Sequence, residues 1–312
     1  MRVVFFGTPE FAVPSLQALI GEGFDVVAAV TQPDKSQGRS RSTVVPSPLK
    51  TAAQAEDVPV LQPERPSDPA FVAQLRELAP DVGVVVAYGH ILKPALLALP
   101  RRGMVNVHPS LLPALRGAAP VEWAILNGLT QTGVTIMQMD EGMDSGPILL
   151  QIPHDIDPEL TGGELSEHLS EMGAQALVEA LALLETNELK PKPQDDARAT
   201  YAPKLTRDTA HIRWSEPAAR VARVIRALDP EPGAWTELEG RVFKLFGARV
   251  VAGGGTPGEM RATDDGLQIM ASEGAVAIDE VQPAGKARMA AAEWLRGGGR
   301  GTESGGGARR FT

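Results

Sequence analysis

The sequence has no cysteine among its 312 residues. This absence excludes a disulfide framework, a cysteine-ligated zinc or iron–sulfur site, and a cysteine nucleophile. No stretch approaches the roughly 20 consecutive apolar residues that span a bilayer. The first apolar run breaks at Gly7, too early for a secretory signal. We therefore expect a cytoplasmic protein.

Basic residues are also fewer than acidic ones. Lys and Arg total 30 against 39 Asp and Glu, which gives a net charge of -9. An acidic balance argues against a protein whose main role is to bind nucleic acid. The excess of negative charge lies wholly in residues 1–207, whereas residues 208–312 are neutral by count. The objection therefore does not apply to the second part of the chain.

Hydrophobic residues make up 43% of the chain and charged residues 22%, which is typical of a folded protein. The length suggests two domains. The first half alternates short Val- and Ile-rich runs with helical patterns, which predicts an α/β domain with an open, mostly parallel sheet. The longest predicted helix covers 163–184. Expected strands cover 2–6, 25–31, 81–87, 104–107, 133–139 and 148–152.

The apolar pattern stops near Lys190, where prolines and charges favour a linker over 190–207. We therefore expect an α/β domain over 1–189 and a second domain over 208–312. Short strands separated by turn residues predict a small β-barrel or sandwich in the second domain. A Gly-rich tail follows Leu295.

Polar residues gather where two predicted strands end. Asn106 and His108 are two positions apart, so their side chains leave the strand on the same side. Asp144 follows the next predicted strand, which places it at the same edge of a parallel sheet. An amide donor, an imidazole and a carboxylate together suit acyl-type transfer. The amide would hold an oxyanion, the imidazole would move protons, and the carboxylate would orient the imidazole.

Plainer interpretations stay open at this point. A histidine near a strand end is more often structural than functional, and His90 also follows a predicted strand. A metal site is not expected, because the sequence has no His-x-x-x-His pair and no compact carboxylate–imidazole cluster.

The segment from Asn106 to Pro113, Asn-Val-His-Pro-Ser-Leu-Leu-Pro, resembles a motif of the formyltransferases that use 10-formyltetrahydrofolate. Arg116-Gly-Ala-Ala-Pro120 and Asp144-Ser-Gly146 fit the same pattern. Other stretches narrow the resemblance to the methionyl-tRNA formyltransferase family. These stretches are residues 6–12, 31–35, 133–140, 201–205 and 282–286.

The resemblance implies a Rossmann-like formyltransferase domain followed by an OB-like β-barrel that helps to hold tRNA. It places Asn106, His108 and Asp144 at the family's catalytic positions, with no metal. The implied reaction transfers the formyl group of the co-substrate 10-formyltetrahydrofolate to the α-amino group of initiator methionyl-tRNA, for translation initiation. We expect a monomer. The folate-contacting loop corresponds to Ser110, Leu111, Leu112 and Pro113.

A basic, Gly- and Ser-rich loop near the predicted site indicates an RNA partner through its own composition. Its cationic residues are Lys35, Arg39, Arg41 and Lys50. Such a loop suits phosphate contacts and can become ordered on binding RNA. The plainer interpretation is a solvated surface loop. In the family that the sequence resembles, this loop enters the tRNA acceptor stem.

Other functions share parts of this pattern. A sugar-nucleotide N-formyltransferase and a formyltetrahydrofolate hydrolase would both keep Asn106, His108 and Asp144. The basic loop and the Pro-Ser-Pro segment at 46–48 argue against the sugar enzyme. A hydrolase has less need of that loop or of a barrel. A pure RNA-binding module would leave the site residues unexplained.

Overall fold

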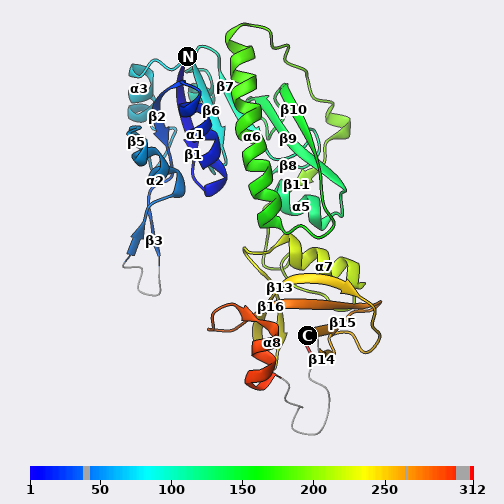
Figure 1. Ribbon diagram of the computed structural model, residues 1–312. Coiled ribbons are helices and arrows are strands. Elements are labelled where there is room, and N and C mark those ends of the chain that lie inside the picture. The colour runs from blue at the N-terminus through cyan, green and yellow to red at the C-terminus, as the bar shows by residue number, and fades with distance from the viewer. Residues whose placement is uncertain (38–42, 264–265, 300–309) are drawn as a thin grey trace. The chain divides into compact units, whose positions relative to one another are not determined.

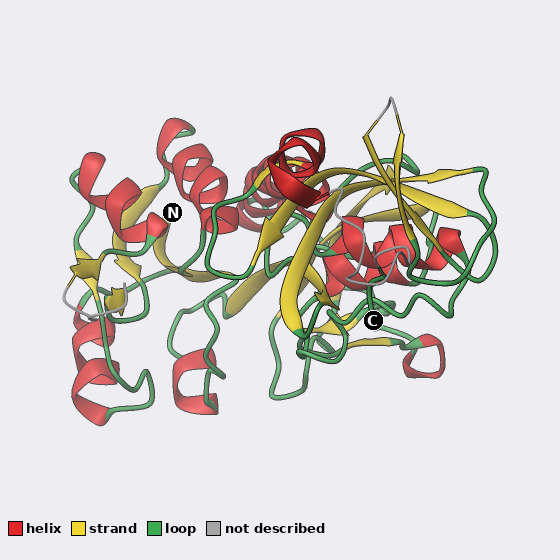
Figure 2. Ribbon diagram, turned by 90° about the horizontal axis from the view of Figure 1, so that it is seen from below, coloured by secondary structure: helices red, strands yellow, loops and turns green. Residues whose placement is uncertain are grey.

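The computed structural model describes residues 1–37, 43–263, 266–299 and 310–312 (Figures 1 and 2). These residues form two compact units. The first unit consists of Met1–Pro120, Gln131–Asp155 and Ser166–Ala202. The second unit consists of Val121–Thr130, Ile156–Leu165 and Pro203–Thr312. The chain crosses between the units several times, and the last crossing follows Ala202, inside the predicted linker. Most of the predicted Gly-rich tail, residues 300–309, lies outside the described residues.

A seven-stranded sheet forms the centre of the first unit, in the order β10-β9-β7-β6-β1-β2-β5. The five strands from β7 to β5 are parallel, whereas β9 is antiparallel to β7 and β10 is antiparallel to β9. The prediction of a mostly parallel sheet is confirmed. The strands are β1 (Arg2–Gly7), β2 (Asp25–Val30), β5 (Val60–Leu61), β6 (Val82–Val86), β7 (Met104–His108), β9 (Gln131–Gln138) and β10 (Ile148–Asp155).

Helices cover both faces of this sheet, which explains why its central strands are apolar throughout. On one face, residues such as Phe6, Val85 and Met104 form a core with α3 (Pro69–Glu77) and α4 (Pro94–Leu97). On the other face, α6 (Gly162–Glu185) lies along the sheet (Figure 1). A Cβ on Gly173 of α6 would lie 2.8 Å from the Val107 side chain, so this glycine lets the helix approach β7 closely.

Two helices begin with a capping side chain followed by proline. Ser47 accepts a hydrogen bond from the N–H of Lys50 at the start of α2 (Pro48–Ala55), and Asp68 accepts one from the N–H of Ala70 at the start of α3. None of the helices in the described part of the chain is long and apolar enough to cross a membrane. The remaining elements of the first unit are α1 (Val13–Gly21), β3 (Lys35–Gln37), β4 (Thr43–Val45), β8 (Arg116–Gly117), β11 (Tyr201–Ala202) and the 3-10 turns Glu10–Ala12 and Asp196–Arg198.

The second unit contains an antiparallel sheet in the order β12-β13-β16-β15-β14, with β17 beside β16. Helix α7 (Ala218–Ala227) packs against β13 and β16. The strands are β12 (Ala234–Leu238), β13 (Arg241–Val251), β14 (Met260–Thr263), β15 (Gly266–Met270), β16 (Ala275–Pro283) and β17 (Met289–Ala290). Short helical segments cover Ala291–Trp294 (α8) and Leu295–Gly299, and α5 spans Pro120–Leu126.

The predicted OB-like barrel is not confirmed, because the strands named above form an open sheet with β12 and β14 at its edges. Residues 310–312 nevertheless contact both edges. Phe311 forms a bridge with Leu238 of β12, and Arg310 forms one with Glu259, just before β14. The N–H of Thr312 also donates to the carbonyl oxygen of Glu237 at 3.0 Å.

Phe311 makes a direct test of this packing possible, because the residue is 1% exposed and its ring lies 5.3 Å from the ring of Phe243. We predict that Phe311→Ala lowers the free energy of unfolding of the second unit by about 3 kcal/mol or more. Val250→Ala on β13 removes an exposed side chain and should change that free energy by less than about 0.5 kcal/mol. Equilibrium denaturation measures both, and equal effects would contradict the packing role of Phe311.

Candidate active site

Strand β7 presents Asn106 and His108 on one face of the sheet. The register aligns Asn106 with Val85 of β6 and with Met137 of β9. Val85 belongs to the core beneath α3 and α4, so Asn106 and His108 share that face. Val107 points to the opposite face, toward α6, because side chains alternate along a strand. The two polar side chains therefore have a fixed position on a buried strand.

The side chain of His108 is 5% exposed, and its imidazole has a polar group beside each ring nitrogen. Nε2 lies 3.1 Å from the carbonyl oxygen of Leu115, and Nδ1 lies 3.8 Å from Oδ2 of Asp144. Burial lowers the pKa of His108 below its usual value of 6.5, and the charge of Asp144 offsets part of that shift. The ring is therefore neutral at pH 7. A proton on Nε2, donated to Leu115, leaves the Nδ1 lone pair available as a base.

Asp144 adopts a backbone conformation that is uncommon outside glycine. Its φ is +49°, in the left-handed region. Its Oδ2 accepts a hydrogen bond of 2.8 Å from the backbone N–H of Gly117. The side-chain amide of Gln194 donates to the Asp144 carbonyl oxygen at 2.8 Å. Two other segments of the chain therefore hold the carboxylate and the backbone of Asp144.

Asp144 reaches His108 by a route that differs from the expected one. In a sheet with all strands parallel, β9 would end at the carboxyl edge of β7, as expected from the sequence. That placement is wrong, because β9 is antiparallel to β7 and its last residue, Gln138, pairs with Val105 near the start of β7. The turn after β9 therefore folds back over the face of the sheet. Asp140 caps this turn by accepting hydrogen bonds from the turn residues themselves, one of them a backbone N–H.

Asn106 supplies a donor on the same face as the neutral imidazole. Its side chain is half-buried, and its amide forms no hydrogen bond with any residue that the structure describes. An uncommitted amide beside a base can hold an oxyanion while the base takes a proton. Within the described ranges, no three His, Asp or Glu side chains gather closely enough to hold a metal ion.

Thr135 of β9 fixes the predicted folate loop, residues 110–113, to the sheet. Its hydroxyl donates to the carbonyl oxygen of Ser110 at 2.6 Å and accepts from the N–H of Leu112 at 3.1 Å. Thr135 is also the residue of β9 that pairs with His108 of β7. The loop therefore lies beside the imidazole.

The four residues of this loop differ in exposure. Ser110 and Leu112 are buried, and Leu112 packs against Met137 of β9. Leu111 and Pro113 are partly exposed. The side chains of Ser110 and Leu112 hold the loop in place, so those of Leu111 and Pro113 are more accessible to a ligand.

The four predicted tRNA contacts occupy different surroundings. Arg39 and Arg41 lie outside the described residues. Lys35 is exposed. The side chain of Lys50 is only 19% exposed, and its ammonium group donates to Asp34 at 2.6 Å. This hydrogen bond is the main reason that the pKa of Asp34 lies below its usual value. The charge of Lys50 is therefore paired at the base of the loop.

The prediction from sequence missed four residues that complete the site: Leu115, Gly117, Thr135 and Gln194. Leu115 and Gly117 contribute backbone groups, which every residue has. Gly117 lies in the Arg116–Pro120 motif and Thr135 in the stretch 133–140, so both belong to segments that carry the family resemblance. Thr135 is an ordinary strand residue in the sequence, and Gln194 belongs to the predicted linker.

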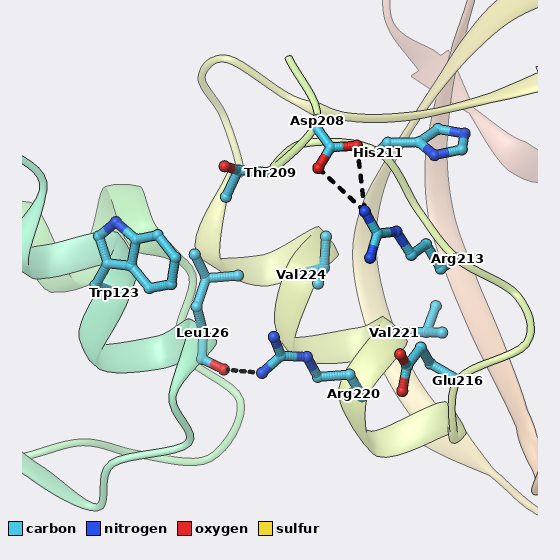
Figure 3. Close-up of a pocket in the computed structure, with 10 residues that line it drawn as sticks. All are labelled: Trp123, Leu126, Asp208, Thr209, His211, Arg213, Glu216, Arg220, Val221 and Val224. Carbon is cyan, nitrogen blue, oxygen red and sulfur yellow. Dashed lines mark hydrogen bonds and ion pairs between the residues drawn. The ribbon is translucent and has the colours of Figure 1, made fainter. Parts of the chain in front are cut away.

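A separate cavity of about 240 Å³ lies in the second unit (Figure 3). Two arginines in its wall are already bonded, as the dashed lines show. Arg213 donates to both carboxylate oxygens of Asp208, at 3.0 and 3.2 Å. Arg220 donates to the carbonyl oxygen of Leu126 at 2.7 Å. The residues around His108 are therefore a better candidate active site than this cavity.

The chain matches two family models. One, described as "Formyl transferase", matches residues 1–181, and the other, "Formyl transferase, C-terminal domain", matches residues 204–299. A protein named methionyl-tRNA formyltransferase from Syntrophus aciditrophicus is 46% identical over 300 residues, which cover 95% of this chain and 96% of that one.

Two solved structures share the fold at low sequence identity. HypX from Aquifex aeolicus, solved in complex with tetrahydrofolic acid, is 20% identical with a TM-score of 0.67. The match covers 95% of this chain and 47% of HypX, so this chain spans about half the length of HypX. An N-formyltransferase from Helicobacter canadensis, solved with folinic acid and dTDP-3-aminofucose, is 18% identical with a TM-score of 0.67. That match covers 91% of this chain and 99% of that one.

The electrostatics of the site predict how the His108 ring titrates. NMR should place the pKa of this imidazole below 6.5, because burial outweighs the attraction of Asp144. Asp144→Asn removes the charge that raises this pKa, so the pKa should fall further. Glu141→Gln removes an exposed charge from the same turn and should have little effect. A pKa that rises in Asp144→Asn would contradict the described geometry.

Proposed function

The chain belongs to the formyl transferase family, and from this premise we propose that it formylates initiator methionyl-tRNA with 10-formyltetrahydrofolate, acting as a cytoplasmic monomer. One observation carries the chemistry. The buried, neutral imidazole of His108 shares a face of β7 with the free amide of Asn106 and lies 3.8 Å from Asp144. The choice of tRNA as acceptor is supported by a relative of that name, 46% identical over nearly the whole chain.

In the proposed reaction, the α-amino nitrogen of the methionyl group attacks the formyl carbon. A C–N bond forms, and the formyl oxygen takes the negative charge. Asn106 donates a hydrogen bond to this oxyanion, a contribution of about 10²–10³ in rate for one such donor. His108 accepts the proton that the attacking nitrogen loses, and the Asp144 carboxylate stabilises the resulting imidazolium. Collapse then breaks the bond to N10 of the folate, and this nitrogen receives the proton.

We propose that the folate lies against the loop of residues 110–113. Leu111 and Pro113 are its partly exposed residues and would contact the ligand, whereas the buried Ser110 and Leu112 keep the loop in place. A folate co-substrate is supported by the family and by the tetrahydrofolic acid named for HypX.

We propose that Lys35, Arg39 and Arg41 contact tRNA phosphates. Lys50, already paired with Asp34, would instead hold the base of the loop. We also propose that residues 1–189 form a Rossmann-like domain and that residues 208–312, after a linker at 190–207, form an OB-like barrel that helps to hold tRNA. The contacts of Arg310–Thr312 with both edges of the second sheet support a barrel.

A formyl-transfer assay tests this function. Purified protein, 10-formyltetrahydrofolate and initiator methionyl-tRNA should yield formylmethionyl-tRNA, and Asn106→Ala should lower kcat by about 10²–10³-fold. An amino-sugar nucleotide and an acceptor-free reaction run in parallel. Transfer to the sugar alone would identify a sugar N-formyltransferase, and formate release without an acceptor would identify a hydrolase. A fully active Asn106→Ala would refute the role of this amide.

The basic loop calls for a second measurement. Replacing Arg39 and Arg41 together with Ala should raise the KM for tRNA, leave the KM for folate unchanged, and reduce the salt dependence of tRNA binding. The charge-matched control replaces Arg65 and Arg76, two exposed arginines elsewhere in the first unit. If the two double variants lose the same tRNA affinity, the loop has no special role.

A further inference from the structure

The side-chain amide of Gln194 joins two segments at the candidate active site. Its Nε2 donates to the carbonyl oxygens of Asp144 and Gly146, at 2.8 and 2.7 Å. Its Oε1 accepts from Nε and Nη2 of Arg116, at 3.1 and 2.7 Å. A glutamine amide has two N–H groups to donate and two lone pairs that accept. Every hydrogen-bonding position of Gln194 is therefore used.

Arg116 determines which way this amide faces. Its side chain is buried, with 4% exposure for the residue, and it also forms an ion pair with Asp196 at 2.7 Å. A buried guanidinium is costly unless it is paired and hydrogen-bonded, so Arg116 retains residues 194–196 beside it. A guanidinium can only donate hydrogen bonds, so the Arg116 side chain must face the accepting oxygen Oε1 of Gln194. With Oε1 on that side, the donor Nε2 faces Asp144.

The segment that carries Gln194 is attached to the site at further points. The backbone N–H of Arg116 donates to the carbonyl oxygen of Thr200 at 2.9 Å, and the N–H of Leu115 donates to Oγ1 of Thr200 at 2.9 Å. Strands β8 and β11 extend this contact as a parallel pair. The same segment therefore supports both neighbours of the His108 imidazole, Leu115 at one nitrogen and Asp144 at the other.

The turn that carries Asp144 needs this support. Its residues 141–143 are exposed, and Asp144 itself has a φ of +49°. Gln194 binds the carbonyl groups on both sides of Ser145, within the turn. Gly146 contributes too, because a Cβ at this position would overlap the carbonyl oxygen of Gln138. The Asp140 cap, the Gly117 N–H and the close return to β9 hold other parts of this turn, and the amide of Gln194 holds its backbone carbonyl groups.

We infer that Gln194 is a positioning residue, which clamps the turn at Asp144–Gly146 so that the Asp144 carboxylate faces His108, and that Arg116 orients it. The inference rests on the proposed function, because formyl transfer is the activity that this clamp would serve. Gln194 acts through Asp144. The segment between the two predicted domains therefore completes the active site as well as connecting them.

Steady-state kinetics give the first test. Gln194→Ala should lower kcat by about 10- to 100-fold, the scale of a small misplacement of a reacting group, with little change in KM for either substrate. Gln194→Glu keeps the size and the contact with Arg116 but loses both donors, so it should be as defective. The control is Gln131→Ala, which removes an exposed amide bonded to Asp155. Near-normal kcat in Gln194→Glu would overturn the inference.

A second test needs no substrate, so it stays decisive if the tRNA assay fails. The pKa of His108 is measured by NMR in the wild type, Gln194→Ala, Asp144→Asn and the double variant. Gln194→Ala should lower this pKa in the wild-type background, because the carboxylate moves away from Nδ1. In the Asp144→Asn background, Gln194→Ala should leave the pKa of His108 unchanged. An equal shift in both backgrounds, or none in the wild type, would refute positioning through Asp144. Should Gln194→Ala fail to fold, Gln194→Glu replaces it, and the shift is then compared between backgrounds.

Discussion

Burial of the His108 imidazole is the constraint on which the site depends. A buried imidazole resists taking up a charge, and its two nitrogens need polar neighbours. Leu115 supplies one of these neighbours and Asp144 the other, and both belong to segments that have left the sheet. Strand β7 therefore determines where the imidazole lies. The surrounding loops determine which nitrogen carries the proton of the neutral ring and how readily the ring accepts a second proton.

The two residues that flank this imidazole share an uncommon backbone conformation. Leu115 and Asp144 have φ values of +57° and +49°, although neither is a glycine. Each such residue costs on the order of 1 kcal/mol and persists only where the surrounding structure holds it. At Leu115 and Asp144 the hydrogen bonds from neighbouring segments provide that hold. The geometry around His108 thus depends on hydrogen bonds between loops, which surround a side chain that the sheet positions.

The sequence could predict the features that depend on short-range patterns. Continuous apolar runs indicated the parallel strands, and the spacing of two placed Asn106 and His108 on one side. The position of Asp144 was expected for the wrong reason, because the direction of β9 depends on strand order, which no local pattern encodes. Gln194 was missed because prolines and charges around it are typical of a linker. A small barrel was predicted for the second domain, but the described strands form an open sheet. Closure of a sheet depends on pairing between distant segments, which local patterns do not encode.

The lowered pKa of His108 suits both halves of formyl transfer. A base with a pKa below neutrality accepts a proton less readily, but its conjugate acid gives that proton up more easily to the departing folate nitrogen. Burial lowers the pKa of the ring, and Asp144 raises it in part by stabilising the imidazolium. The distance from Asp144 to Nδ1 therefore sets the balance between accepting and returning the proton. A residue that fixes this distance can control the rate without touching either substrate.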